Sequence, residues 1–133
     1  MNTKKFLLAS LAVFVTIQVL DFVIHGLILG STYTSLESIW RPDMADTMWV
    51  MYVTGIVFSL LFVYIFAKGY EGKGITEGLK YGFIMGIFVH FVGSFNQFAV
   101  YPVPYGLTWQ WVIFGTIEIT IAGLVAALIY KPK

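Results

Sequence analysis

Residues 6–29 read FLLASLAVFVTIQVLDFVIHGLIL, a predominantly apolar run that contains two ionisable side chains, Asp21 and His25. An α-helix rises about 1.5 Å per residue, so about 20 apolar residues are enough to cross a hydrocarbon core of about 30 Å. Three further apolar runs of similar length follow, at residues 49–67, 81–100 and 107–130. The sequence therefore predicts four transmembrane helices in a single domain that covers residues 1–133.

The composition of the chain favours the same class. Hydrophobic residues make up 59% of the sequence and charged residues 11%, whereas soluble domains carry about 25% charged residues. None of the four runs alternates apolar and polar residues, as the strands of a membrane β-barrel would. The connections are short, which favours an antiparallel up-down-up-down bundle. The net charge of +1 gives no basis for binding nucleic acid.

The basic residues indicate how this bundle is oriented. One side of the predicted topology carries all the lysines, namely Lys4, Lys5, Lys68, Lys73, Lys80, Lys131 and Lys133, and the connections on the other side carry only Arg41. By the positive-inside rule, both termini are expected to be cytoplasmic. The opposite helix ends carry side chains that suit a membrane interface, which we interpret as an aromatic outer mouth: Trp40, Trp49, Trp109, Trp111, Tyr101 and Tyr105.

Four ionisable side chains fall inside the predicted spans: Asp21, His25, His90 and Glu118. Such residues are costly in lipid, so they normally face inward and find partners. Counting from the outer helix ends places Asp21 about 12 Å deep, His90 and Glu118 about 15 Å deep and His25 about 6 Å deep. We expect a polar cavity that is open to the outer side. Its candidate residues for binding or proton exchange are Asp21, His25, His90, Glu118, Gln97, Asn96 and Gln18.

Other uses of the four ionisable residues stay open at this point. Asp21 with His25, and Glu118 with His90, would also serve as structural pairs that lock the helices. The four side chains include ligand types that suit zinc, iron or manganese, but no HxxxH or ExxH element accompanies them. A haem held by His25 and His90 would have to overcome a difference in depth of roughly 9 Å.

We favour a binding or accessory module for a small molecule, a proton or an ion. The first alternative is a membrane enzyme in which a histidine acts as general base on a lipid or isoprenoid, although no nucleophile elbow or phosphate-binding loop is present. The second is a structural subunit of a larger membrane complex. Small residues spaced four apart, such as Gly82 and Gly86, also permit a homo-oligomer.

Several short features recur together in known small membrane proteins. They are Asp21, the tyrosine at Tyr33, YVTG at residues 52–55, YGFIMG at residues 81–86 leading to Asn96, and Glu118. In this pattern the chain resembles small four-helix bacterial membrane proteins that are grouped as domains of unknown function. Those families commonly have aspartate where this chain has Glu118. The resemblance implies the four-helix fold and a bacterial or archaeal cytoplasmic membrane, and it implies no activity.

Overall fold

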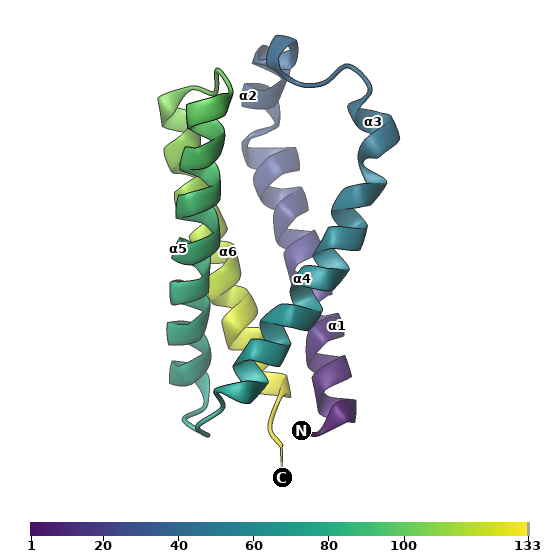
Figure 1. The fold of residues 1–133 in the computed structure, drawn as a ribbon, viewed down its shortest axis with the longest axis vertical. Helices are drawn as coiled ribbons and strands as arrows, with labels where there is room; N and C mark the ends of the chain where they lie inside the picture. Colours follow the sequence, from purple (N-terminus) through teal and green to yellow (C-terminus); the bar gives the residue numbers. More distant parts are fainter. Residues whose placement is uncertain (133) are drawn as a thin grey trace.

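The structure is a computed structural model that describes residues 1–132, so Lys133, one of the lysines behind the predicted orientation, lies outside the described residues. The described part of the chain is helical and contains no strand (Figure 1). Within it, four helices are long and apolar enough to cross a membrane: Thr3–Ile28, Met44–Lys68, Ile75–Val100 and Tyr105–Ile129. The all-α class and the four long apolar helices are thus confirmed.

The long helices are joined by short connections, of which the first is partly helical. In chain order, the elements are α1 (Thr3–Asp21), a π-helical segment η1 (Phe22–Ile28), α2 (Gly30–Ser35), a 3-10 turn η2 (Glu37–Ile39), α3 (Met44–Thr47), α4 (Trp49–Lys68), α5 (Ile75–Val100) and α6 (Tyr105–Ile129). Both termini and residues 69–74 lie at one end of the molecule, hereafter the terminal end (Figure 1). The opposite end, with α2, is called the α2 end.

Helix α5 begins at Ile75 and not at residue 81 as predicted. Its first turn carries polar residues, which conceal a helix start from an argument based on hydropathy. Gly74, at φ 71°, makes the sharp turn that precedes the helix. The Glu77 carboxylate then accepts hydrogen bonds from the backbone N–H groups of Glu71 and Lys73, at 2.6 and 2.8 Å. The loop is therefore tied to the start of the helix.

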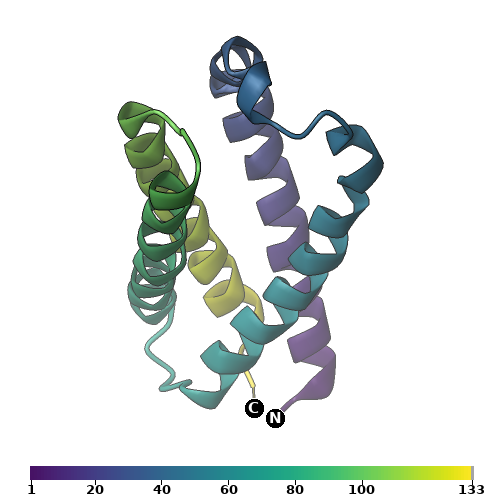
Figure 2. The same cartoon turned by 45° about the horizontal axis from the view of Figure 1, so that its top comes forward.

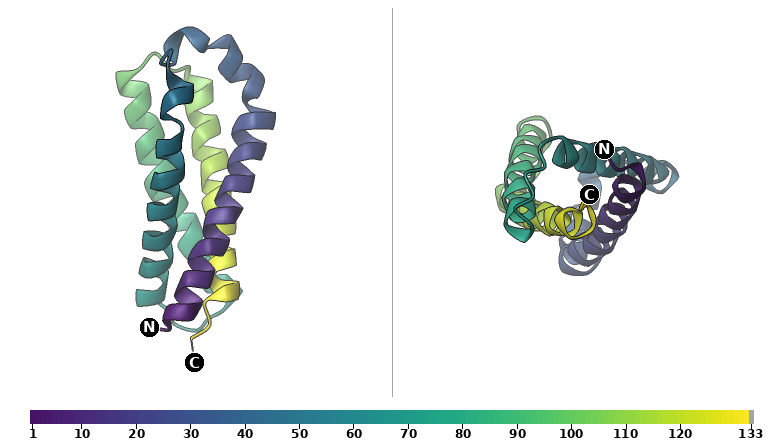
Figure 3. Two further views of the ribbon diagram at one scale, coloured as in Figure 1. Left: turned by 90° about the vertical axis from the view of Figure 1, so that its right-hand side faces the viewer. Right: turned by 90° about the horizontal axis from the view of Figure 1, so that it is seen from below.

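Helices α5 and α6 lie side by side along their length (Figures 1 and 3). Their backbones approach closely because small residues face one another. A Cβ atom added to Gly82 would lie 2.8 Å from the Thr120 Cα, and one added to Gly86 would lie 2.9 Å from the Thr116 Cα. Small residues permit such contacts between helices that lack a hydrophobic driving force in lipid.

The main apolar core lies toward the terminal end, where α1, α4 and α6 meet. Its buried residues include Ala9, Val13, Phe62, Phe66, Ala122, Ala126 and Tyr130. Toward the α2 end, α4 diverges from α5 and α6 (Figure 2), and residues 49–54 of α4 are all exposed. The molecule is thus closely packed at the terminal end and spread at the α2 end.

Candidate functional site

Glu118 lies on α6 with its side chain 3% exposed. Among the described residues its Oε1 atom has no hydrogen-bond partner. Asp21 on α1 is the ionisable group that acts on this carboxyl group, so the two acids lie near each other. Gly115 and Ala122 flank Glu118 on the same helix face and leave room for this approach. The structure therefore brings together two acids that are 97 positions apart in the sequence (118 minus 21).

His25 connects Asp21 to the α2 end. Its Nε2 atom is 3.7 Å from Asp21 Oδ1, an ion-pair distance, and its Nδ1 atom is 2.5 Å from Tyr33 Oη. The residue lies in the π-helical segment, where Leu29 N–H donates to the Ile24 carbonyl five positions earlier. π-Helical turns are rare and are frequently found at functional sites.

Tyr33 on α2 is held by two tryptophans. Trp111 Nε1 donates to Tyr33 Oη at 2.8 Å, and Trp40 Nε1 donates to the Tyr33 backbone carbonyl at 3.0 Å. Because an indole nitrogen only donates, Tyr33 Oη accepts from Trp111. Its second bond, to His25 Nδ1, can carry the proton on either atom, because a phenol both donates and accepts. Burial raises the pKa of the Tyr33 phenol, while the hydrogen bond from Trp111 opposes this change, so the phenol retains its proton at neutral pH.

His90 on α5 packs its imidazole ring directly against Gly115 on α6. A Cβ atom added to Gly115 would overlap this ring, with His90 Cδ2 at 2.6 Å. The ring is also close enough to Asp21 and His25 for their charges to act on it. The polar cluster therefore comprises five residues from five elements, namely Asp21 (α1), His25 (η1), Tyr33 (α2), His90 (α5) and Glu118 (α6).

The three candidate amides lie outside this cluster. Gln18 faces α4, where a Cβ atom added to Gly55 would be 3.2 Å from its Nε2 atom. Asn96 and Gln97 on α5 are exposed. Neither side chain makes a hydrogen bond to another residue within residues 1–132. A hollow of about 670 Å³ at the α2 end is lined by residues of the first loop, including Glu37, Trp40 and Arg41, and by none of the seven candidates.

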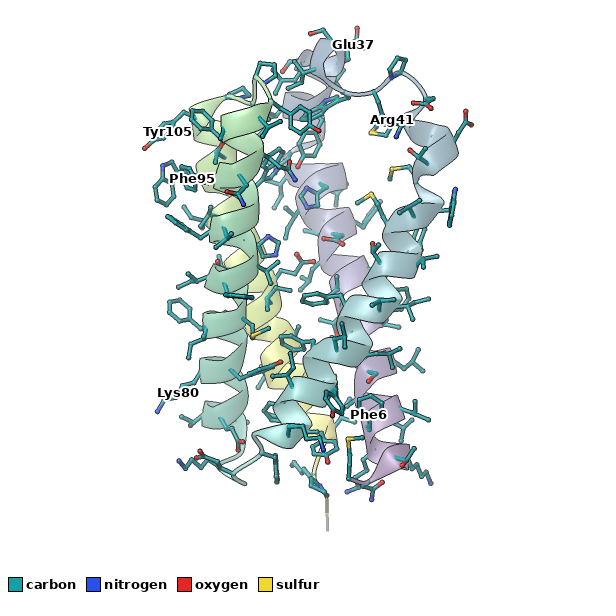
Figure 4. The ribbon with its side chains drawn as sticks, viewed as in Figure 1. Phe6, Glu37, Arg41, Lys80, Phe95 and Tyr105 are labelled. Atoms are coloured by element: carbon teal, nitrogen blue, oxygen red, sulfur yellow. The ribbon has the colours of Figure 1, made fainter. Side chains whose placement is uncertain are left out.

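The expected aromatic mouth is divided into separate groups. Trp40 and Trp111 belong with Tyr33, their rings 6.5 Å apart. Trp109 and Tyr105 pack instead with Phe95 and Phe98, and Phe95 and Tyr105 project from the side of α5 and α6 away from α1 (Figure 4). The remaining two members, Trp49 and Tyr101, are exposed.

The metal and haem hypotheses do not fit this arrangement. Within residues 1–132 no group of three or more His, Asp or Glu side chains is placed to hold a metal ion, so Asp21, His25, His90 and Glu118 do not form the metal centre that their residue types allowed. Both ring nitrogens of His25 already face partners, Tyr33 and Asp21, which leaves no free nitrogen for a haem iron.

No family model, curated protein or solved structure matches the chain. We therefore infer the function from the geometry of the polar cluster. That geometry is a line of groups able to carry protons, running from buried Glu118 through Asp21 and His25 to Tyr33 beside the first loop. Toward the terminal end the buried residues are mainly apolar, including Ile119, Ala122 and Val13, and the hydroxyl groups of buried Ser10 and Ser59 are bonded to carbonyls of their own helices. The line of carboxyl, imidazole and phenol groups thus extends from Glu118 toward the α2 end.

Proposed function

We propose that the chain is an integral membrane protein whose four long helices form an antiparallel up-down-up-down bundle with both termini on the cytoplasmic side. The lengths of the helices support this proposal. So does the gathering of lysines at the terminal end, including Lys5, Lys73 and Lys131, because basic residues favour the cytoplasmic side. A bacterial or archaeal cytoplasmic membrane, and membership among the four-helix proteins that the sequence resembles, form part of the same proposal.

Within this membrane setting, the protein acts as a binding or accessory module that takes up and releases a proton at the carboxyl pair of Asp21 and Glu118. The observation that carries this function is the buried Oε1 atom of Glu118, which lacks a partner and lies beside a second acid. Two carboxylates at close range in a low-dielectric interior repel strongly. A proton held between them removes that repulsion.

The groups around the pair favour exchange with the outer side. His25 and Tyr33 extend the line of hydrogen-bonding groups to the first loop, and Asp21 and His25 remain 36% and 42% exposed, so the described part of the chain does not seal them off. His90 faces the pair from α5. The ionisable residues of α4 are Tyr52, Tyr64 and Lys68. Helix α4 therefore adds no carboxylate or imidazole to the cluster.

The test is an infrared pH titration of the full chain in lipid nanodiscs, in which the carboxylic acid C=O band is followed. The wild type is expected to show a titrating band that both Glu118→Gln and Asp21→Asn alter. The matched control is Glu37→Gln, which removes an exposed acid of the first loop and is expected to leave that band unchanged. If Glu118→Gln and the wild type give the same difference spectra, the carboxyl pair does not exchange a proton and the proposed function fails.

A further inference from the structure

Three of the five methionines of the chain fall within the eight residues MADTMWVM, at Met44, Met48 and Met51. These residues belong to the continuous candidate span Met44–Lys68. Steps of four and three residues place side chains on one face of a helix. Met48 lies at the junction of α3 and α4, and its backbone angles remain helical (φ −61°, ψ −26°), so the three thioether side chains lie on the same side of this segment. This spacing is visible in the sequence itself.

The same helix face turns inward farther along α4. Continuing in steps of four and three residues, it passes through Gly55, Ser59, Phe62 and Phe66, of which the last three are buried. Gly55 lies against Phe14 of α1, because a Cβ atom added there would be 3.3 Å from the Phe14 ring. The methionine face is thus the continuation of the face that packs against the rest of the molecule.

At the α2 end, however, nothing in the described chain buries this face. Met44, Met48 and Met51 are 47%, 38% and 56% exposed, because α4 has diverged from α5 and α6 there (Figure 2). Sulfur atoms, drawn in yellow, lie along the side of α3 and upper α4 that faces α1 (Figure 4). Met44 also helps to line the hollow at this end.

The chemistry of these side chains points to a particular class of ligand. Thioether sulfurs are soft donors that select Cu(I) over harder ions. Methionine has three rotatable bonds, so sulfurs from neighbouring turns can converge on one point. Asp46 in the same segment is exposed and supplies negative charge close by. We propose that Met44, Met48 and Met51 form a binding site for a soft monovalent cation, Cu(I) or its chemical analogue Ag(I). This site is independent of the carboxyl pair.

The test titrates Ag(I) into the purified full chain in a chloride-free detergent buffer and follows binding by calorimetry, with Cu(I) measured by competition against a chromogenic chelator. The key variant replaces all three residues, as Met44→Leu, Met48→Leu and Met51→Leu, because leucine keeps the volume and apolar character of methionine. The matched control is Met85→Leu on α5. Circular dichroism of each variant checks that the helices are retained.

The wild type and the Met85→Leu variant are expected to bind Ag(I), and the triple variant is expected to lose this binding. Each single replacement in the triad should weaken binding by more than about tenfold, since losing even an outer-shell partner of a metal costs about this much. Glu118→Gln should bind Ag(I) normally, which separates this site from the proposed function. The proposal is overturned if the wild type does not bind, if the triple variant binds equally well, or if Zn(II) binds as tightly as Ag(I).

Discussion

The contact between α5 and α6 makes a strong prediction about Gly123. A Cβ atom at this position would lie 2.8 Å from both the N and Cα atoms of Gly82, and closer still to the carbonyl oxygen of Gly78. These are backbone atoms of α5, so a change of rotamer cannot relieve the overlap. To restore an ordinary contact of 3.4 Å with Gly82, the helices would have to separate locally by about 0.6 Å, and the closer carbonyl oxygen of Gly78 requires more than this.

A separation of this size has an estimable cost. A gap of about 0.5–1 Å forfeits a quarter to a half of the dispersion energy of each atom pair along the seam. Overpacking a close contact typically costs about 1–3 kcal/mol, and the rigid backbone places Gly123→Ala near the upper end of that range. Alanine has a higher intrinsic helix propensity than glycine, which offsets about 1 kcal/mol of this destabilisation. We therefore expect Gly123→Ala to lower the free energy of unfolding by about 2 kcal/mol.

The matched control is Gly93→Ala on α5, where an added Cβ meets nothing within 4 Å. This variant is expected to be more stable than the wild type by about 0.5–1 kcal/mol, because only the backbone preference changes. Both variants can be compared by equilibrium unfolding in mixed micelles of increasing SDS fraction, followed by tryptophan fluorescence. If Gly123→Ala is as stable as Gly93→Ala, the close approach of α5 and α6 is wrong.

Two further substitutions test hydrogen bonds on either side of Glu118. Tyr81→Phe keeps the ring but removes the hydrogen bond in which Tyr81 Oη donates to the Phe62 carbonyl at 2.5 Å. We expect the free energy of unfolding to fall by about 1 kcal/mol in the same assay. An unchanged midpoint would show that this bond does not link α4 and α5. Trp111→Phe removes the hydrogen-bond donor to Tyr33 Oη and should increase hydrogen exchange of the α2 backbone amides. A protection pattern equal to that of the wild type would show that this hydrogen bond does not hold α2 to α6.

The four long helices are predictable because membrane crossing requires about 20 apolar residues, a pattern that a sequence displays directly. The same reasoning fails at helix ends that leave the apolar region. The first turns of α5 contain Thr76, Glu77 and Lys80, so hydropathy placed the start near residue 81, whereas the backbone is helical from Ile75. The turn at Gly74 that starts this helix depends on local backbone geometry, which hydropathy does not report.

Depth counting placed Asp21 and Glu118 at similar depths, about 12 and 15 Å, and the structure brings the two acids near each other. It assumed straight α-helices, however, and the π-helical segment Phe22–Ile28 changes the direction in which His25 points. No local sequence pattern identifies such a segment, because a π-helical turn is stabilised by the contacts that it makes. The role of Tyr33 depends in the same way on Trp111, 78 positions later in the chain. These contacts become visible only once the helices are packed.

The position of Glu118 follows from the difference between the two ends of the molecule. Toward the terminal end, close contacts between small residues and aromatic rings exclude water, as at Ala122 and Phe62, which are 0% and 1% exposed. Toward the α2 end the helices diverge, and side chains such as His25 remain partly exposed. Glu118 lies where these two regions meet. In the proposed function, a proton would therefore reach it through polar groups on the α2 side, and transport across the membrane would require the mainly apolar core around Ala122 to open.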